Sequence, residues 1–344
     1  MGQLAKYAYT NAKIRAMLSF MLPENVWSRL KAAKDMAEIA EILAETPYRT
    51  MVEKAGVKEN PDLLETGLLS GNLDTHRKVV AATTGKKEKR LIESLLERYE
   101  IEQLKTALRV WHKKAPAGLA ESLYGDKIKN RIDYKRIAHA PSLDEILFLL
   151  GNTPYARPLA KAREKYETTN SLFYLEVALD IDYYQRLDEM VQKLSKTDRV
   201  MAKTILGVEI DIENIHWLIR LRKYYSLNMG EILEWIIPGG SKITKSSIRG
   251  SYISDDVNNL LDMVSPGPYT KIKDLGESNN QQLEEFLSAA LKQQARKALS
   301  GFPFTIGTVL GYLVLKKDET RNLISLLYAK KFGWEKEQID SVIH

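Results

Sequence analysis

The chain has 344 residues, of which 44% are hydrophobic and 28% charged; this composition excludes a wholly disordered protein and suffices for two or three domain-sized cores. With only 11 prolines and 19 glycines, we expect long helices instead of a turn-rich sheet protein. The net charge of +6 suits an anionic membrane surface, an acidic protein partner or nucleic acid, and does not choose among them.

Cysteine is absent from the sequence, which excludes disulfides, thiolate metal sites and a cysteine nucleophile. The first residues lack a basic segment followed by an apolar one, so we expect no secretory signal and a cytoplasmic location. The longest uncharged stretch, residues 301–315, is shorter than the ~20 apolar residues of a membrane-spanning helix. We interpret it as a helix buried in a protein core.

Three short patterns follow one another in the first third of the chain. An apolar run ends in Pro-Tyr at Tyr48, a Leu-Glu-x-x-Leu pattern contains Glu65, and an amide followed by aliphatic residues begins at Gln103. Proline stops a helix because it lacks the backbone donor and disfavours helical geometry in the residue before it. Aliphatic i, i+4 pairs place one apolar stripe along a helix. We therefore predict three helices, one ending near Tyr48 and the others carrying Glu65 and Gln103.

The same three patterns recur twice in the same order, at Tyr155, Glu176 and Asn214 and then at Tyr269, Glu284 and Asn322. Between the first and second copies, the Leu-Glu and amide patterns are shifted by the same number of residues. Between the second and third copies, the two patterns again share one shift. This agreement indicates internal triplication. We predict an all-α protein of three similar helical units at 1–117, 118–238 and 239–344. The boundaries are glycine- and proline-containing segments at 115–118 and 238–240.

The repeat spacing also relates charged residues to one another. Arg109 and Arg220 are equivalent positions, because their separation equals the shift between the first and second copies. Tyr328 occupies the corresponding place in the third unit. Glu65 could then pair with Arg109. The equivalent pair in the second unit would join Glu176 to Arg220. We hypothesise partly buried pairs that fix the register of the second and third helices; glutamates exposed beside a leucine stripe are the alternative.

Carboxylates offer an alternative to a purely structural protein. Asp180, Asp182 and Asp211 could serve a helical metal-dependent enzyme as oxygen ligands or as general acid and base. Alternate residues on a helix point about 200° apart, so neighbouring acids diverge, and we expect no metal or cofactor. We expect Asp211, near the start of its helix, to contact free backbone amides there. Basic runs at 86–90 and 220–223 leave a nucleic-acid-binding scaffold as a further alternative.

Three segments resemble the C (or d) subunit of archaeal A-type and vacuolar V-type ATPases. They are YTNAKIRAM at 9–17, GVEIDIENIHWLIRLRKYY at 207–225 with IIPGG at 236–240, and PFTIGTVLGYLVLKKDETRNL at 303–323. The chain departs from the family pattern at Lys13, where arginine is common, and around Asn322, where Asp-Ile-Glu-Asn is replaced.

The resemblance implies a non-catalytic subunit, a funnel of three helical domains around a pseudo-threefold axis. One copy, monomeric when isolated, would sit on the cytoplasmic side of the membrane rotor ring without spanning the membrane and without binding nucleic acid. Its partners would be the ring and the central-shaft subunits. It would transmit torque between ATP hydrolysis or synthesis and proton or sodium transport.

Overall fold

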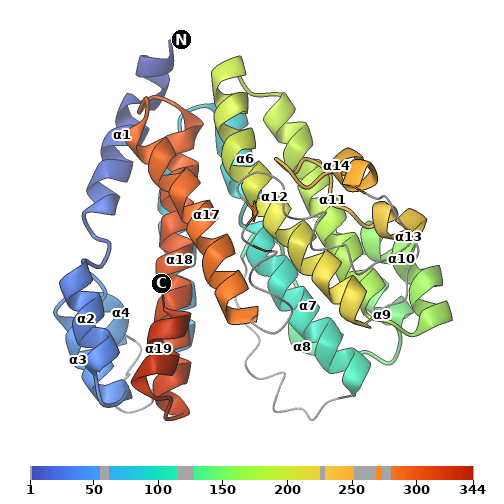
Figure 1. Ribbon diagram of the computed structural model, residues 1–344, viewed down its shortest axis with the longest axis horizontal. Helices are drawn as coiled ribbons and strands as arrows, with labels where there is room; N and C mark the ends of the chain where they lie inside the picture. Colours follow the sequence, from blue (N-terminus) through green and yellow to red (C-terminus); the bar gives the residue numbers. More distant parts are fainter. Residues whose placement is uncertain are drawn as a thin grey trace. The chain divides into compact units, whose positions relative to one another are not determined.

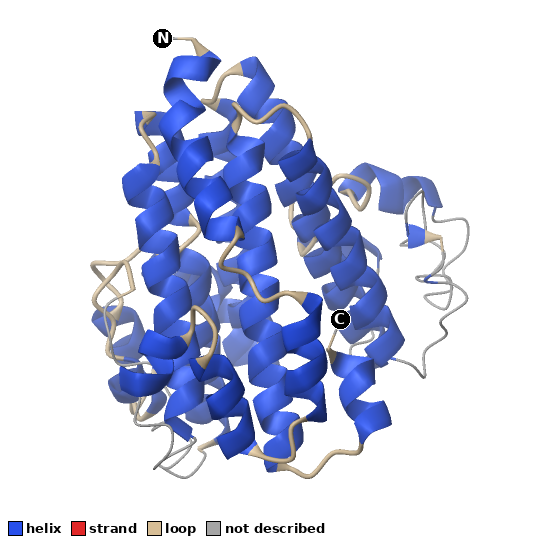
Figure 2. Ribbon diagram, turned by 90° about the vertical axis from the view of Figure 1, so that its left-hand side faces the viewer, coloured by secondary structure: helices blue, strands red, loops and turns tan. Residues whose placement is uncertain are grey.

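The computed structural model describes residues 2–54, 62–114, 128–224, 229–251, 269–270, 272 and 280–343. Throughout these ranges the chain forms helices and connecting loops and no strand, which confirms the predicted all-α class (Figure 2). The helices are α1 (Gln3–Leu18), α2 (Glu24–Ala32), α3 (Met36–Ala44), α4 (Arg49–Lys54), α5 (Asp62–Ala82), α6 (Lys86–Ser94), α7 (Glu97–Lys113), α8 (Tyr134–Ala138), α9 (Leu143–Leu149), α10 (Ala156–Thr169), α11 (Phe173–Gln192), α12 (Lys196–Tyr224), α13 (Met229–Glu234), α14 (Lys245–Ser251), α17 (Asn280–Ser300), α18 (Ile306–Lys331) and α19 (Lys336–Val342).

The recurrent patterns lie on helices as expected. The Leu-Glu patterns are on α5, α11 and α17, and the amide patterns are on α7, α12 and α18. Helix α3 ends shortly before Tyr48 and α9 shortly before Tyr155. The residues before Tyr269, 260–268, lie outside the described part of the chain.

Side-chain caps explain where several helices begin. Asp35 accepts a hydrogen bond from the backbone N–H of Glu38 at the start of α3, and Ser142 accepts one from Glu145 at the start of α9. Thr305 caps the start of α18. The uncharged stretch 301–315, expected to form a buried helix, is therefore helical only after Pro303. Its first two turns are buried, and no helix within the described ranges is long and apolar enough to cross a membrane.

The chain forms two compact units, each discontinuous in sequence. The first comprises residues 1–89, 194–209 and 264–344, and the second comprises 90–193 and 210–263. The division into three units at 1–117, 118–238 and 239–344, and the pseudo-threefold axis, stay predictions.

The first unit joins the two ends of the chain. Helix α18 packs against α17 and α1, and α19 packs against α2 (Figure 1). Helix α18 also packs against α5. One core contains Leu30 and Leu43 near the amino terminus, Leu64 on α5, and Leu326 and Ile339 near the carboxyl terminus. The third amide helix therefore shares a core with the first helices of the chain.

The second unit is built around α7, α10 and α11. Helix α7 packs against α8 and α11, and α10 packs against α9 and α11 (Figure 1). Aromatic side chains add to this packing: the rings of Phe173 and Trp217 lie edge to face at 5.2 Å, and those of Phe173 and Trp235 at 6.0 Å. The first of these contacts joins α11 to α12.

Candidate functional site

Buried and half-buried charges on α7, α11 and α12 form a network within the second unit. Lys105 Nζ lies 2.6 Å from Asp180 Oδ1, and Arg98 forms an ion pair with Glu213. The indole N–H of Trp217 donates to Asp180 Oδ2 at 3.2 Å. Each charge therefore has a partner on another helix.

The pKa values in this network follow from burial and pairing. Burial raises the pKa of Asp180 to about 6, although the charge of Lys105 opposes the shift. Burial also acts to raise the pKa of Glu213, but the positive charges around it, Arg98 first, outweigh burial and lower the pKa to about 2. The pKa of Lys105 is raised because its acidic neighbours, Asp180 first, outweigh burial. The network thus holds opposite charges together inside the fold.

Glu176, predicted as one half of an ion pair, is buried and contacts two arginines. Arg109 Nε donates to its Oε1 at 2.6 Å, and Arg220 Nη1 lies 3.8 Å from its Oε2. Glu65 accepts a hydrogen bond from the Tyr328 hydroxyl. Glu65 and Arg109 belong to different compact units, and their pairing stays a prediction.

The amides and the remaining glutamate of the repeats differ in environment. Asn214 is fully buried: its Oδ1 accepts from Ile237 N at 2.8 Å, and its Nδ2 donates to Ile237 O at 3.0 Å. Asn322 is buried and its Nδ2 lies 3.4 Å from Asp318 Oδ2. Gln103 is half-buried and Glu284 is exposed. The repeat residues therefore differ in burial and in hydrogen-bond partners.

Three carboxylates, of which the sequence made only Asp211 a candidate, lie one helical turn before the amides. They are Glu100, Asp211 and Glu319, and all three are buried. Residues at i and i+3 share a helix face, so acid and amide point to the same side. Extending the amide pattern by one helical turn toward the amino terminus would have found them.

Two of these carboxylates receive a tyrosine hydroxyl and a backbone N–H from another segment. Glu100 Oε2 accepts from the Tyr155 hydroxyl at 2.6 Å, and its Oε1 accepts from Lys129 N at 2.6 Å. Glu319 Oε1 accepts from the Tyr48 hydroxyl at 2.7 Å, and its Oε2 accepts from Leu22 N at 2.7 Å. The Pro-Tyr and amide patterns thus meet in space, each tyrosine with a helix from another sequence copy.

Asp211 fixes a loop, but from a different position than expected. It lies in the middle of α12, which begins at Lys196, so the expected contact with amides at its own helix start is wrong. Its Oδ1 accepts from Lys242 N at 3.0 Å and from Ile243 N at 2.8 Å. The helix begins earlier because the apolar stripe of α12 continues back through Ile205 and Ala202.

The acids proposed for a metal-dependent enzyme have separate structural partners. Asp180 is held by Lys105, Asp182 Oδ2 lies 2.7 Å from Arg186 Nε, and Asp211 is held by backbone amides. Over the described ranges, the structure holds no cluster of three or more acidic, histidine or cysteine side chains suited to a metal ion. Asp180 thus joins α11 to α7, Asp211 holds a loop, and Asp182 pairs within its own helix.

Sequence comparison identifies proteins with similar chains. The family described as ATP synthase (C/AC39) subunit matches residues 10–342. Among similar curated proteins, the C subunit of the A-type ATP synthase of Methanosphaera stadtmanae is 25% identical over 334 residues, covering 94% of this chain and 84% of the relative. The same subunit from Methanosarcina mazei and from Archaeoglobus fulgidus is in each case 27% identical, covering 97% and 98% of this chain and 92% and 96% of the relatives. The chain therefore belongs to the ATP synthase (C/AC39) subunit family.

Proposed function

We propose that this chain is a non-catalytic rotor subunit of an A/V-type ATPase that links the central shaft to the membrane ring. One copy would sit peripherally on the cytoplasmic side and transmit torque between ATP hydrolysis or synthesis and proton or sodium transport. The observation that carries the proposal is the family match over residues 10–342, together with relatives named as the C subunit of A-type ATP synthases. The family is one of structural subunits of the complex, not of enzymes.

The buried contacts suit a part that transmits force. Such a part needs stiffness and two complementary surfaces and does not need a reactive group. In the first unit, Asp198 is fully buried and its Oδ1 accepts from Ile306 N at 2.9 Å, while its Oδ2 lies 3.0 Å from Lys6 Nζ. Lys6 also pairs with Glu88. Segments far apart in the sequence are thus joined by charged hydrogen bonds, which resist relative displacement.

Recovery of the native complex tests the membership. An affinity tag on the full chain, expressed in its own host, should recover ATPase subunits, shaft proteins and ring proteins from detergent-solubilised membranes. An untagged strain serves as the control for non-specific recovery. Recovery of a soluble enzyme complex with no membrane component would contradict the proposal.

The linking role needs a second measurement. In membrane vesicles assembled without this chain, ATP hydrolysis by the soluble part of the complex should persist while ATP-driven ion transport is lost. Adding the purified chain back should restore transport. Ion transport at the wild-type rate in its absence would exclude a role in coupling.

A further inference from the structure

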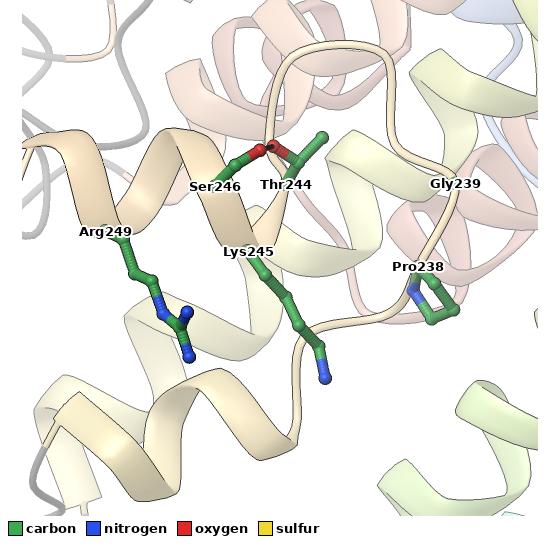
Figure 3. Close-up of a pocket in the computed structure, with 6 residues that line it drawn as sticks. All are labelled: Pro238, Gly239, Thr244, Lys245, Ser246 and Arg249. Atoms are coloured by element: carbon green, nitrogen blue, oxygen red, sulfur yellow. Dashed lines mark hydrogen bonds between the residues drawn. The ribbon is translucent and has the colours of Figure 1, made fainter.

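An open pocket of about 540 Å³ lies on the second unit beside α14. Its walls come from the loop after α13 and from the first turns of α14 (Figure 3). The lining residues are Pro238, Gly239, Thr244, Lys245, Ser246 and Arg249. None of them has a large apolar side chain, so the pocket suits a polar ligand.

Buried polar contacts from α12 fix the loop wall of this pocket. Asn214 exchanges two hydrogen bonds with Ile237, at the start of the loop, and Asp211 accepts the N–H groups of Lys242 and Ile243, at its end. Gly239 between them has φ of +94°, a conformation that side chains other than glycine rarely adopt. The wall is therefore held from both sides before any ligand arrives.

Helix α14 is fixed equally well. Ile248 on the helix and Ile243 just before it are both fully buried and anchor it. Thr244 N donates to Ser247 Oγ at 2.8 Å, and Ser247 N donates to Thr244 Oγ1 at 3.1 Å, which caps the first turn reciprocally. A helix held in this way presents its outward side chains at fixed positions.

Two cations point from α14 into the same space. Lys245 and Arg249 are one helical turn apart, and in Figure 3 both side chains extend from the same side of the helix. Both are exposed, and among the described residues neither has an ion pair or a side-chain hydrogen bond. The hydroxyl oxygens of Thr244 and Ser246 lie 3.0 Å apart and form a hydrogen bond with each other. The positive charge available to a ligand in the pocket therefore comes from Lys245 and Arg249.

We propose that this pocket binds a phosphate group, either of a free phosphate compound or of a lipid headgroup. A guanidinium offers two parallel donors to phosphate oxygens and an ammonium adds a point charge, so the pair matches a doubly charged phosphate. A recess of this volume admits a phosphate with a small attached group. The proposal is independent of the chain's place in an ATPase, because it rests on the second unit alone.

Calorimetric titration of the full chain with pyrophosphate tests the site. The wild type should bind with Kd on the order of millimolar at low salt, and the double variant Lys245→Ala/Arg249→Ala should bind at least about tenfold more weakly. The control is Lys161→Ala/Lys165→Ala, which removes two exposed cations one turn apart on α10 of the same unit. Its affinity should stay within about twofold of the wild type.

Three results would overturn the proposal. They are equal binding by the Lys245→Ala/Arg249→Ala variant, equal weakening in the α10 control, and equal affinity for malonate, a dianion without phosphorus. Co-sedimentation with phosphatidic acid vesicles, against neutral phosphatidylcholine vesicles, separates the sources. Vesicle binding that depends on Lys245 and Arg249 identifies a headgroup, and pyrophosphate binding alone identifies a free phosphate compound. Binding of neither probe refutes the site.

Discussion

Replacing Glu319 with glutamine should weaken the join between the two ends of the chain. Its two carboxylate oxygens serve different donors: Oε2 accepts from Leu22 N, whereas Oε1 accepts from the Tyr48 hydroxyl and from Lys316 Nζ, each at 2.7 Å. Glutamine keeps one acceptor oxygen and presents an NH₂ group at the other position. One side of the contact then loses its acceptor and its charge assistance.

The expected cost follows from the number of bonds lost. A hydrogen bond to a charged group contributes about 1.5–3 kcal/mol, and a buried donor left without a partner costs about 1–3 kcal/mol. We therefore expect Glu319→Gln to lower the free energy of unfolding of the first unit by about 3 kcal/mol. Urea unfolding measures the change, and amide hydrogen exchange at Leu22 should accelerate with it.

Two matched variants control this experiment. Glu65→Gln removes a carboxylate of the same unit whose bond to Tyr328 is exposed, and should cost less than about 1 kcal/mol. Glu100→Gln removes the equivalent buried carboxylate in the second unit and should cost about as much as Glu319→Gln. If Glu319→Gln costs no more than Glu65→Gln and exchange at Leu22 is unchanged, the buried carboxylate does not hold the chain ends together.

Three further predictions concern packing and charge. Glu176→Gln should lower the free energy of unfolding by about 1–2 kcal/mol, because Arg109, its partner at 2.6 Å, is partly exposed; an unchanged urea midpoint would contradict the ion-pair hypothesis. Gly311→Ala should lower the free energy of unfolding by about 1–3 kcal/mol, since the added carbon would lie 2.7 Å from a backbone carbonyl oxygen of α17. Gly71→Ala is the control: open space surrounds this glycine, so the substitution should raise the free energy of unfolding by up to about 1 kcal/mol in the same urea assay. Asp180 should titrate near pH 6 in carbon-13 NMR of the folded chain. Because the pKa of Asp180 is raised above its ordinary value of 3.8, the contribution of this group to stability is present below pH 3.8 and is lost as the pH rises through about 6. Titration of Asp180 below pH 4 would refute the assignment.

The helices and their repeat could be predicted from sequence because both leave local signals. Apolar stripes at helical spacing placed Leu64 and Leu175 on helices, and both are fully buried. Proline marked the end of α3 and of α9 for the same local reason. Such signals depend only on neighbours along the chain.

The contacts between segments could not be predicted in the same way. The sequence suggested Arg220 as the partner of Glu176, but Arg109 from the preceding copy lies much closer, 2.6 Å against 3.8 Å. Spacing shows which residues are equivalent and does not show which copies meet. The expected position of Asp211 at a helix start is wrong because the motif does not mark that start: α12 extends back to Lys196.

The buried carboxylates explain why a chain with a structural role carries so many charges in its interior. An apolar side chain in place of Glu100 would add burial, but it would leave the N–H groups of Lys129 and Asn130 and the Tyr155 hydroxyl without an acceptor. A carboxylate can accept from several donors at once, and each bond restricts direction as well as distance, whereas apolar packing restricts mainly volume. Burying the charge costs desolvation energy, so this arrangement trades some stability for precise placement of one segment against another. If the chain transmits torque, as proposed above, precise placement matters more than the stability given up, because any relative movement of its segments would absorb motion inside the subunit before that motion reached the next subunit.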